Sequence, residues 1–201
     1  MKKVHTIPVG PLQENCYIVW EDSTRQALLF DPGDQPEDIR AFLKKESLSP
    51  LGILLTHAHF DHIGAIPALA KELSLSVWCP QADLPLYHSP DNCMAPWYPA
   101  VTGLPEPAKP PAPEFGYQVL STPGHTPGGT SYYFPEEGFV LTGDTLFAGS
   151  VGRTDFPGGS ERALQHSVTQ VLFALPGKTL VLPGHGPKTT IATEKMDPFF
   201  A

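Results

Sequence analysis

The stretch LLTHAHFDH, residues 54–62, contains three imidazoles and one carboxylate within six positions. In an extended segment, side chains two residues apart point the same way, so His57 and His59 are expected to bind one ion from the same side. A bend into a helix would then present Asp61 and His62 in another direction, toward a second ion. Because imidazole and carboxylate ligands suit zinc and other borderline divalent ions, the stretch predicts a strand that ends in a metal site.

Three later segments share one plan, in which an apolar run leads into a glycine and then into a ligand-type residue. These ligand-type residues are His125, Asp144 and His185. Each run predicts a buried strand, and each glycine permits a tight turn that points the next side chain back over the strand end. Asp144 has two carboxylate oxygens and can contact both ions, while His125 completes the first ion site and His185 the second. A solvent hydroxide bridging the ions would give each about four donors, an open arrangement typical of catalysis.

Length and charge are those of one compact enzyme domain. The chain has 201 residues, so residues 1–201 are predicted to form a single domain with a substantial core. A formal net charge of −8 argues against a nucleic-acid partner. Because no long apolar stretch follows the two N-terminal lysines, neither a secretory signal nor a membrane span is expected, and the cytoplasm is the default location. Three cysteines without paired spacings predict reduced thiols.

Strand-like and helix-like stretches alternate along the chain, which indicates an α/β layered protein. Helices are predicted to begin near Pro36, from Gly64 and after Ser160, with Ser160 as N-cap of the last helix in the chain. Cys16 is predicted to be a buried strand residue. Apart from the runs described above, strands are predicted at residues 4–9, 16–20, 27–30 and 52–55.

One region breaks this regularity, because ten of the 24 prolines fall between residues 80 and 113. So much proline is incompatible with a helix interior or a central strand, and residues 80–113 are therefore predicted to form a long, partly extended surface excursion. The excursion is either a passive loop or a cap over a pocket. The second reading rests on Tyr87, Trp97 and Tyr98, since long loops on rigid scaffolds often carry binding residues.

Three further histidines lack the pattern of the ligand segments. His5 lies in an expected edge strand, His88 in the proline-rich excursion, and His166 on a helix away from its apolar stripe. A single histidine outside such a cluster is more often solvated than functional, so all three are predicted to be exposed to solvent.

The run HAHFDH at residues 57–62, followed in order by His125, Asp144 and His185, resembles the metallo-β-lactamase superfamily. The likeness spans nearly the whole chain, from residues 15–17 to the end. Further motifs make the chain similar to the short, single-domain glyoxalase II-like (hydroxyacylglutathione hydrolase-like) hydrolases. These motifs are DPG at 31–33, TPGHTPG at 122–128, GDTLF at 143–147, GRTDFPGG at 152–159, PGHGP at 183–187 and EKMDPFF at 194–200.

The resemblance implies an α/β fold, the αββα metallo-β-lactamase sandwich, in which two mixed β-sheets are flanked by helices and the metals lie at one edge. It also implies hydrolysis of hydroxyacylglutathione thioesters such as S-D-lactoylglutathione, a step of methylglyoxal detoxification, with a small glutathione conjugate as partner. The cofactors expected are two divalent metal ions, zinc in the first place, with iron or manganese as alternatives. The seven predicted metal ligands are His57, His59, Asp61, His62, His125, Asp144 and His185.

The chain departs from the longer glyoxalase II enzymes in two places. It ends where their C-terminal helical region, which helps to hold glutathione, would begin. They also place a lysine and a tyrosine in the loop after the bridging aspartate, where this chain has Arg153 and Asp155. These two residues are the candidates for substrate binding, because Arg153 can pair with a substrate carboxylate bidentately. The alternative is that Arg153 is structural and ties the loop down.

The expected mechanism is metal-assisted hydrolysis. Two ions lower the pKa of a bridging water from ~15.7 to about 7, so hydroxide is available at neutral pH. The hydroxide attacks the thioester carbonyl while one ion polarises the carbonyl oxygen. Asp61, besides binding metal, is expected to act in catalysis by orienting the nucleophile. A thiolate is a good leaving group, so no general acid is assigned.

Three alternatives remain open from the sequence. A mononuclear iron persulfide dioxygenase of the same superfamily shares the GRTDF string at residues 152–156 but would consume oxygen and use a subset of the ligands. A lactonase or β-lactamase would hydrolyse a different bond, and the loop of Arg153 counts against it. A non-enzymatic metal-binding or RNA-binding module is disfavoured by the acidic charge and by the open metal positions.

Overall fold

The computed structural model describes residues 1–196. Within these residues the chain divides into two compact units, of which the first is Met1–Pro113 and the second begins at Glu114. The single domain expected over residues 1–201 stays a prediction. Part of the closing EKMDPFF motif, residues 197–200, lies outside the described residues.

The first unit contains a five-stranded sheet in the order β1-β2-β3-β4-β5. Neighbours among the first three strands are antiparallel, and β3, β4 and β5 are parallel, so the sheet is mixed. β1 ends this order and is exposed or half-buried at every position except Val9, whereas β2 is buried at every position up to Trp20, as expected for a central strand. The strands are β1 (Lys2–Val9), β2 (Glu14–Glu21), β3 (Gln26–Phe30), β4 (Ser49–Leu54) and β5 (Val77–Trp78).

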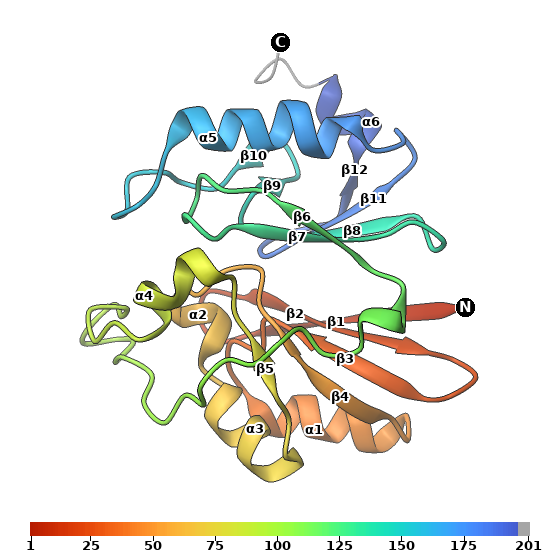
Figure 1. Ribbon diagram of the computed structural model, residues 1–201, viewed down its shortest axis with the longest axis vertical. Helices are drawn as coiled ribbons and strands as arrows, with labels where there is room; N and C mark the ends of the chain where they lie inside the picture. The colour runs from red at the N-terminus through yellow and green to blue at the C-terminus, as the bar shows by residue number, and fades with distance from the viewer. Residues whose placement is uncertain (197–201) are drawn as a thin grey trace. The chain divides into compact units, whose positions relative to one another are not determined.

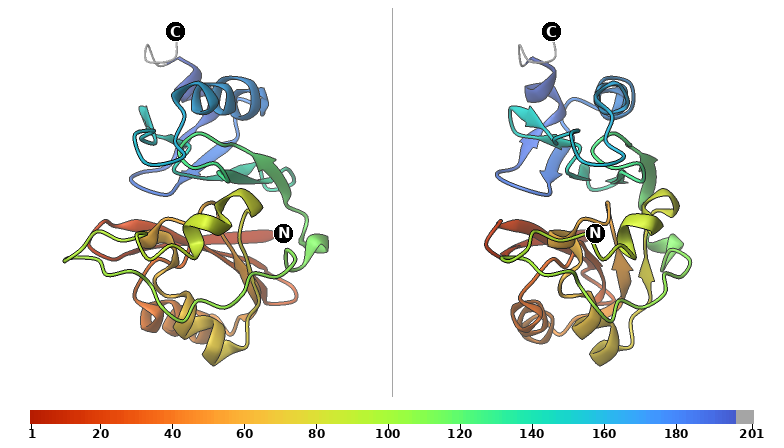
Figure 2. Two further views of the ribbon diagram at one scale, coloured as in Figure 1. Left: turned by 60° about the vertical axis from the view of Figure 1, so that its left-hand side comes forward. Right: turned by 90° about the vertical axis from the view of Figure 1, so that its left-hand side faces the viewer.

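Helices α1 (Pro36–Lys45) and α3 (Ile66–Leu73) cover one face of this sheet (Figure 1). Both have proline in the first turn, where its missing N–H is not needed, as the sequence predicted. Ile39 of α1 and Leu69 of α3 join one buried cluster with Ile18 of the sheet. The two helices lie side by side on the same face in both views of Figure 2.

The proline-rich segment is more structured than one extended excursion. It contains a 3₁₀ turn, η1 (Gln81–Asp83), and a short helix, α4 (Leu84–Tyr87). Tyr87 is 2% exposed, and its hydroxyl donates a hydrogen bond of 2.9 Å to the carbonyl of Pro105, so this ring packs in the core. Trp97, by contrast, is 76% exposed.

The second unit contains another mixed sheet, in the order β12-β11-β8-β7-β6. β11 runs parallel to β8, and the remaining pairs are antiparallel. β7 and β8 are buried throughout, but β6 is largely exposed, so the prediction of a buried strand before His125 was wrong. The 3₁₀ turn η2 (Pro113–Phe115) spans the boundary between the units in the sequence. The strands of the second unit are β6 (Gln118–Ser121), β7 (Thr130–Phe134), β8 (Phe139–Gly143), β9 (Leu146–Phe147), β10 (Ser150–Val151), β11 (Leu180–Pro183) and β12 (Thr189–Thr190).

The helix predicted after Ser160 begins there, with the Ser160 hydroxyl accepting a 3.3 Å hydrogen bond from the amide of Ala163. It is α5 (Glu161–His166), which continues into a π-helical turn, η3 (Ser167–Val171), and a 3₁₀ turn, η4 (Leu172–Ala174). It is not the last helix, because α6 (Ile191–Lys195) follows, capped by the hydroxyl of Thr190. The apolar faces of these helices are buried. Leu164 of α5 is 3% exposed, and a buried cluster with residues of the second sheet contains Val168, Leu172 and Ile191.

Each unit therefore consists of a mixed sheet with helices packed on it, and the α/β fold class predicted from the sequence is confirmed. Cys16 is fully buried in β2, as predicted. His5, His88 and His166 are exposed, also as predicted. Among the residues that the structure describes, no helix is long and apolar enough to cross a membrane.

Candidate metal centre

The first half-site consists of His57, His59, Asp61 and His62. His57 and His59 lie between the end of β4 and helix α2 (Phe60–Ile63), and Asp61 and His62 lie within α2. His59 is the extended residue before α2, with φ −65° and ψ 152°, so the predicted bend from strand to helix is present. The ring of His57 lies 4.9 Å from that of His59 and 4.1 Å from that of His62, measured between centroids. The Nε2 atom of His62 lies 4.0 Å from a carboxylate oxygen of Asp61. The four predicted ligands of this unit are therefore brought together.

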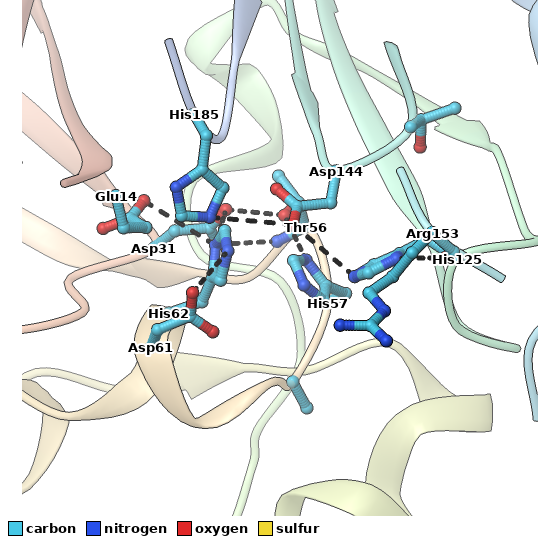
Figure 3. A network of polar contacts seen from close by, with 12 residues as sticks. Glu14, Asp31, Thr56, His57, Asp61, His62, His125, Asp144, Arg153 and His185 are labelled. Atoms are coloured by element: carbon cyan, nitrogen blue, oxygen red, sulfur yellow. Dashed lines mark hydrogen bonds and ion pairs between the residues drawn. The ribbon is translucent and has the colours of Figure 1, made fainter. Parts of the chain in front are cut away.

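Asp31 supports the first half-site by contacts with Thr56 and His62 (Figure 3). Its Oδ1 accepts a 2.7 Å hydrogen bond from the amide of Thr56, and its Oδ2 accepts a 2.5 Å hydrogen bond from the Thr56 hydroxyl. The same Oδ2 lies 3.2 Å from Nδ1 of His62. Asp31 is 2% exposed and has a φ of +47°, a left-handed conformation that costs about 1–2 kcal/mol in a residue other than glycine. The buried hydrogen bonds of its carboxylate explain why this conformation is retained.

These contacts fix the tautomers of His57 and His62, and the tautomer determines which ring nitrogen can bind a metal. The one hydroxyl proton of Thr56 goes to Asp31, so the Thr56 oxygen, 3.0 Å from Nδ1 of His57, accepts the Nδ1–H of that ring. Likewise His62 donates its Nδ1–H to Asp31. Both imidazoles are thereby set in the tautomer whose lone pair is on Nε2, the arrangement that outer partners commonly impose on metal-binding histidines.

We expect Thr56→Val to weaken metal binding by about 10–100-fold, the usual effect of removing an outer partner of a metal ligand. Valine has the same shape, but it leaves the Nδ1–H of His57 without this acceptor and takes one donor from Asp31. Competition with a chromogenic chelator measures the change. Thr6→Val, a strand position outside the site, is the control, and equal affinities of the Thr56→Val and wild-type proteins would contradict the assignment.

The charge around the first half-site is negative. Glu14, 1% exposed, has its Oε1 3.6 Å from Nδ1 of His62, next to the equally buried Asp31. Burial raises the pKa of the Cys16 thiol well above its usual range, and the charges of Glu14 and Asp31 raise it further. Two buried carboxylates behind a group of imidazoles favour a bound cation over an anion.

Parallel strand pairing brings Asp144 and His185 together in the second half-site. Pro183 of β11 pairs with Gly143 of β8, and the amide of Gly184 donates a 2.8 Å hydrogen bond to the carbonyl of Gly143. Because parallel strands end at the same edge of a sheet, the residues that follow them become neighbours. Gly143 has a φ of +49°, the left-handed conformation that favours glycine, as the sequence predicted. Gly184 has no positive φ, so the turn before His185 does not depend on the conformational freedom of glycine.

Asp144 lies between the two histidines of the second half-site, which consists of His125, Asp144 and His185. Its Oδ2 is 3.5 Å from Nε2 of His125 and 3.7 Å from Nε2 of His185 (Figure 3). The Nδ1 atom of His125 donates a 2.7 Å hydrogen bond to the carbonyl of Arg153, which again leaves the lone pair on Nε2. This carboxylate oxygen is therefore within 3.7 Å of both imidazole nitrogens and could bind a metal ion together with either histidine.

Two glycines permit the close packing around this half-site. Gly124, with a φ of +138°, precedes His125, and a Cβ there would lie 2.3 Å from the backbone nitrogen of Leu164. A Cβ on Gly152 would lie 1.9 Å from the carbonyl oxygen of Asp144. A larger residue at either position would displace a ligand-bearing loop.

Arg153 and Asp155, the candidates for substrate binding, are paired with each other. The Nε and Nη2 atoms of Arg153 each donate a 2.6 Å hydrogen bond to the Asp155 carboxylate, and the guanidinium lies 4.1 Å from the ring centre of Phe156. Hydrogen bonding by Arg153 lowers the pKa of Asp155 to about 2. Both side chains are exposed, at 56% and 65%. An exposed guanidinium with a fixed orientation is suited to binding an anion.

The donor set fits divalent metal ions. It contains imidazole nitrogens and carboxylates, without the four-cysteine set of a structural zinc site. Donor atoms of Asp31, His57 and His62 all lie within 4.8 Å of one another inside the first unit. Sequence reasoning missed Glu14, Asp31 and Thr56 as supporting residues, although Asp31 is part of the quoted DPG motif.

The chain belongs to the metallo-β-lactamase superfamily, whose family model matches residues 9–185. It is similar to the probable metallo-hydrolase YqgX of Bacillus subtilis (strain 168), with 39% identity over 98% of this chain and 97% of the relative. It is also similar to the hydroxyacylglutathione hydrolase GloC of Haemophilus influenzae (strain ATCC 51907 / DSM 11121 / KW20 / Rd), with 34% identity over 96% of this chain and 94% of the relative.

Solved structures agree with this membership. A di-iron-bound form of TTHA1623 has a TM-score of 0.88 and 45% identity over 97% of this chain and 99% of that one. BLEG-1, a B3 metallo-β-lactamase, has a TM-score of 0.80 and 36% identity over 99% of this chain and 100% of that one. ETHE1 from Myxococcus xanthus has a TM-score of 0.71 and 31% identity over 97% of this chain and 82% of that one. The chain is a metal-dependent hydrolase of this superfamily with a histidine and aspartate metal-binding cluster.

Proposed function

We propose that this protein is a dinuclear metal-dependent hydrolase that cleaves hydroxyacylglutathione-type thioesters, such as S-D-lactoylglutathione. One observation carries the proposal of two ions: Oδ2 of Asp144 lies 3.5 Å from Nε2 of His125 and 3.7 Å from Nε2 of His185. A carboxylate in that place can serve an ion on each side. The similarity to GloC over nearly the full length of both chains supports the substrate class.

The proposal keeps the division of ligands between two ions that was expected from the sequence. His57, His59 and His125 hold the first ion, Asp61, His62 and His185 hold the second, and Asp144 is shared. The order of these residues along the chain matches that of the superfamily, which supports the division. The donor set suits zinc and iron alike, and the di-iron form of TTHA1623 supports iron as an occupant beside the zinc expected from the sequence.

When bound, the two ions supply a hydroxide at neutral pH and Lewis-acid polarisation of the thioester carbonyl. The remaining steps belong to the chain. The Asp61 carboxylate accepts a hydrogen bond from the attacking oxygen and thereby orients it. The Nδ1 contacts of His57, His62 and His125 keep the ligand rings fixed, so little reorganisation is needed during the reaction. Departure of the thiolate requires no proton donor from the protein.

A metal titration combined with three assays tests the function. We expect hydrolysis of S-D-lactoylglutathione by the apo protein to reach its maximum near two equivalents of Zn²⁺ or Fe²⁺, without oxygen uptake. Full activity at one equivalent of iron, with oxygen consumed in the presence of glutathione persulfide, would instead establish the dioxygenase. Preferential hydrolysis of a β-lactam or lactone would instead establish the lactonase or β-lactamase alternative. Elemental analysis of the purified protein identifies the resident metal.

Substrate recognition is assigned to Arg153 and Asp155. Two of the five guanidinium N–H donors are used by Asp155, which leaves three for a substrate carboxylate. Asp155 and the ring of Phe156 then contribute by holding the guanidinium in one orientation. This role is compatible with the exposure of both charged side chains.

We expect Arg153→Ala to lower kcat/KM for glutathione thioesters about ten- to hundredfold, mainly through KM. The estimate corresponds to the loss of one charge-assisted hydrogen bond, about 1.5–3 kcal/mol. Metal content should not change, since the side chain is not a ligand. A neutral thioester without the carboxylate is the control and should be hydrolysed almost equally by both proteins. If both substrates lose activity together with a lower melting temperature, Arg153 is a structural residue.

A further inference from the structure

Two side chains of the proline-rich segment hold the backbone around one metal ligand, and we infer that Asp83 and Asn92 are positioning residues for His59. The inference rests on the proposed function in one respect, namely that His59 binds an ion. Oδ2 of Asp83 accepts a 3.2 Å hydrogen bond from the amide of Ala58. Nδ2 of Asn92 donates a 2.7 Å hydrogen bond to the carbonyl of Ala58, and its Oδ1 accepts one of 3.1 Å from the amide of Phe60. Both neighbours of His59 in the chain are therefore fixed.

The chemistry of Asn92 is specific to this task. A carboxamide can accept a hydrogen bond from an N–H and donate one to a C=O at the same time, which a carboxylate cannot do. Asn92 is 6% exposed and Asp83 is fully buried, so water is poorly placed to substitute for either side chain.

The segment carrying these side chains is itself anchored. Asp83 ends η1, and the next helix, α4, buries the ring of Tyr87. Further along, the ring of Tyr98 lies 5.1 Å from that of Phe60, and its hydroxyl accepts a 3.1 Å hydrogen bond from the amide of Leu12. The contacts to residues 58–60 thus come from a fixed part of the molecule.

His59 needs such support because it lies in irregular chain. β4 ends at Leu54 and α2 begins at Phe60, so the ligand lies outside both regular elements. A metal ligand has to be held within about 0.5 Å and 10–20° of its productive position. Three hydrogen bonds to the flanking residues provide this restraint. Loss of the restraint should affect the ion bound by His59 and spare the ion bound by Asp61 and His62.

The test is Co²⁺ titration of the apo protein, followed by the absorption spectrum of the bound cobalt and by competition with a chelator. Wild-type protein should bind two equivalents tightly. Asn92→Asp keeps the size of the side chain and loses the donor to Ala58, so one equivalent should weaken about 10–100-fold while the other is retained. Asp91→Asn, an exposed change in the same segment, is the matched control. Two equivalents bound as tightly as in wild type would overturn the inference, and so would equal weakening of both with a less stable apo protein.

A second measurement requires neither metal nor turnover. In the apo protein, Asp83→Ala should speed amide hydrogen exchange at Ala58 more than tenfold, and Asn92→Ala should do the same at Phe60, with exchange in β2 unchanged. Asp83→Asn keeps an oxygen that can accept the hydrogen bond from the amide of Ala58. Unlike Asp83→Ala, this variant should exchange that amide as slowly as wild type and should bind two equivalents of Co²⁺ tightly. If wild type binds one ion or hydrolyses no thioester, the proposed function fails, yet the exchange data still decide whether the two side chains hold this loop. Unchanged exchange in both alanine variants would overturn the inference.

Discussion

Asp144→Asn is expected to reduce kcat/KM for thioester hydrolysis on the order of a thousandfold, which corresponds to about 4 kcal/mol of transition-state stabilisation. The amide has almost the same shape but lacks the negative charge that offsets two cations. Its oxygen would also lie between the Nε2 atoms of His125 and His185, 3.5 and 3.7 Å away in the native protein, as a much weaker ligand. Steady-state kinetics together with metal analysis by inductively coupled plasma mass spectrometry measure both effects.

The metal content of the Asp144→Asn protein shows whether the loss of activity comes with the loss of an ion. We expect the Asp144→Asn protein to retain about one equivalent, because the imidazoles of each half-site remain. Asp91→Asn, in which the same chemical change is made at an exposed position, should behave like wild type. An Asp144→Asn protein that is active and holds two full equivalents would refute the dinuclear assignment.

Gly33→Ala is expected to destabilise the protein by about 3 kcal/mol, at the upper end of the usual cost of overpacking. A Cβ at this position would lie 1.7 Å from the carbonyl oxygen of Asp61 and 2.8 Å from a carboxylate oxygen of Glu14, both of which belong to the first half-site or its support. The backbone of residues 31–33 or the start of α2 must therefore move. Differential scanning calorimetry should show a melting temperature lower by roughly 6–12 °C.

Gly177→Ala provides the comparison for this result. A Cβ there would approach the Cβ of Ala192 at 3.4 Å, an ordinary contact, and Gly177 has no positive φ. The expected change in the free energy of unfolding is within about 0.5 kcal/mol. An equal melting temperature for Gly33→Ala and wild type would show that the ligand loop tolerates displacement.

The sequence predicts those parts of the fold in which apolar residues recur at the regular spacing of a strand or a helix. The strands around Ile18 and Leu29 and the apolar faces of α1 and α3 are present where expected, because periodic burial is visible in the sequence itself. The metal site is predictable for a different reason: seven ligand-type side chains in a fixed order along the chain are the pattern of a metal site.

The sequence does not predict the contacts that support the metal ligands. Asp31, Asp83 and Asn92 act on backbone or side-chain groups from 25 to 34 residues away, and such contacts leave no local pattern. Proline content suggested that residues 80–113 are a surface excursion, yet prolines in first turns and irregular chain are compatible with a buried Tyr87. The exposure of β6 depends on what covers the sheet face, which composition does not encode.

The position of β1 at the end of its sheet bears on how the protein behaves at high concentration. In the part of the chain that the structure describes, β1 pairs with β2 alone, and an eight-residue strand of this kind can template addition of a strand from another molecule. Lys3 is charged and half exposed, and Pro8 contributes no N–H to an incoming strand. Charged residues and prolines on an edge strand disfavour such pairing, so we expect valine at both positions to lower solubility while thioester hydrolysis is retained.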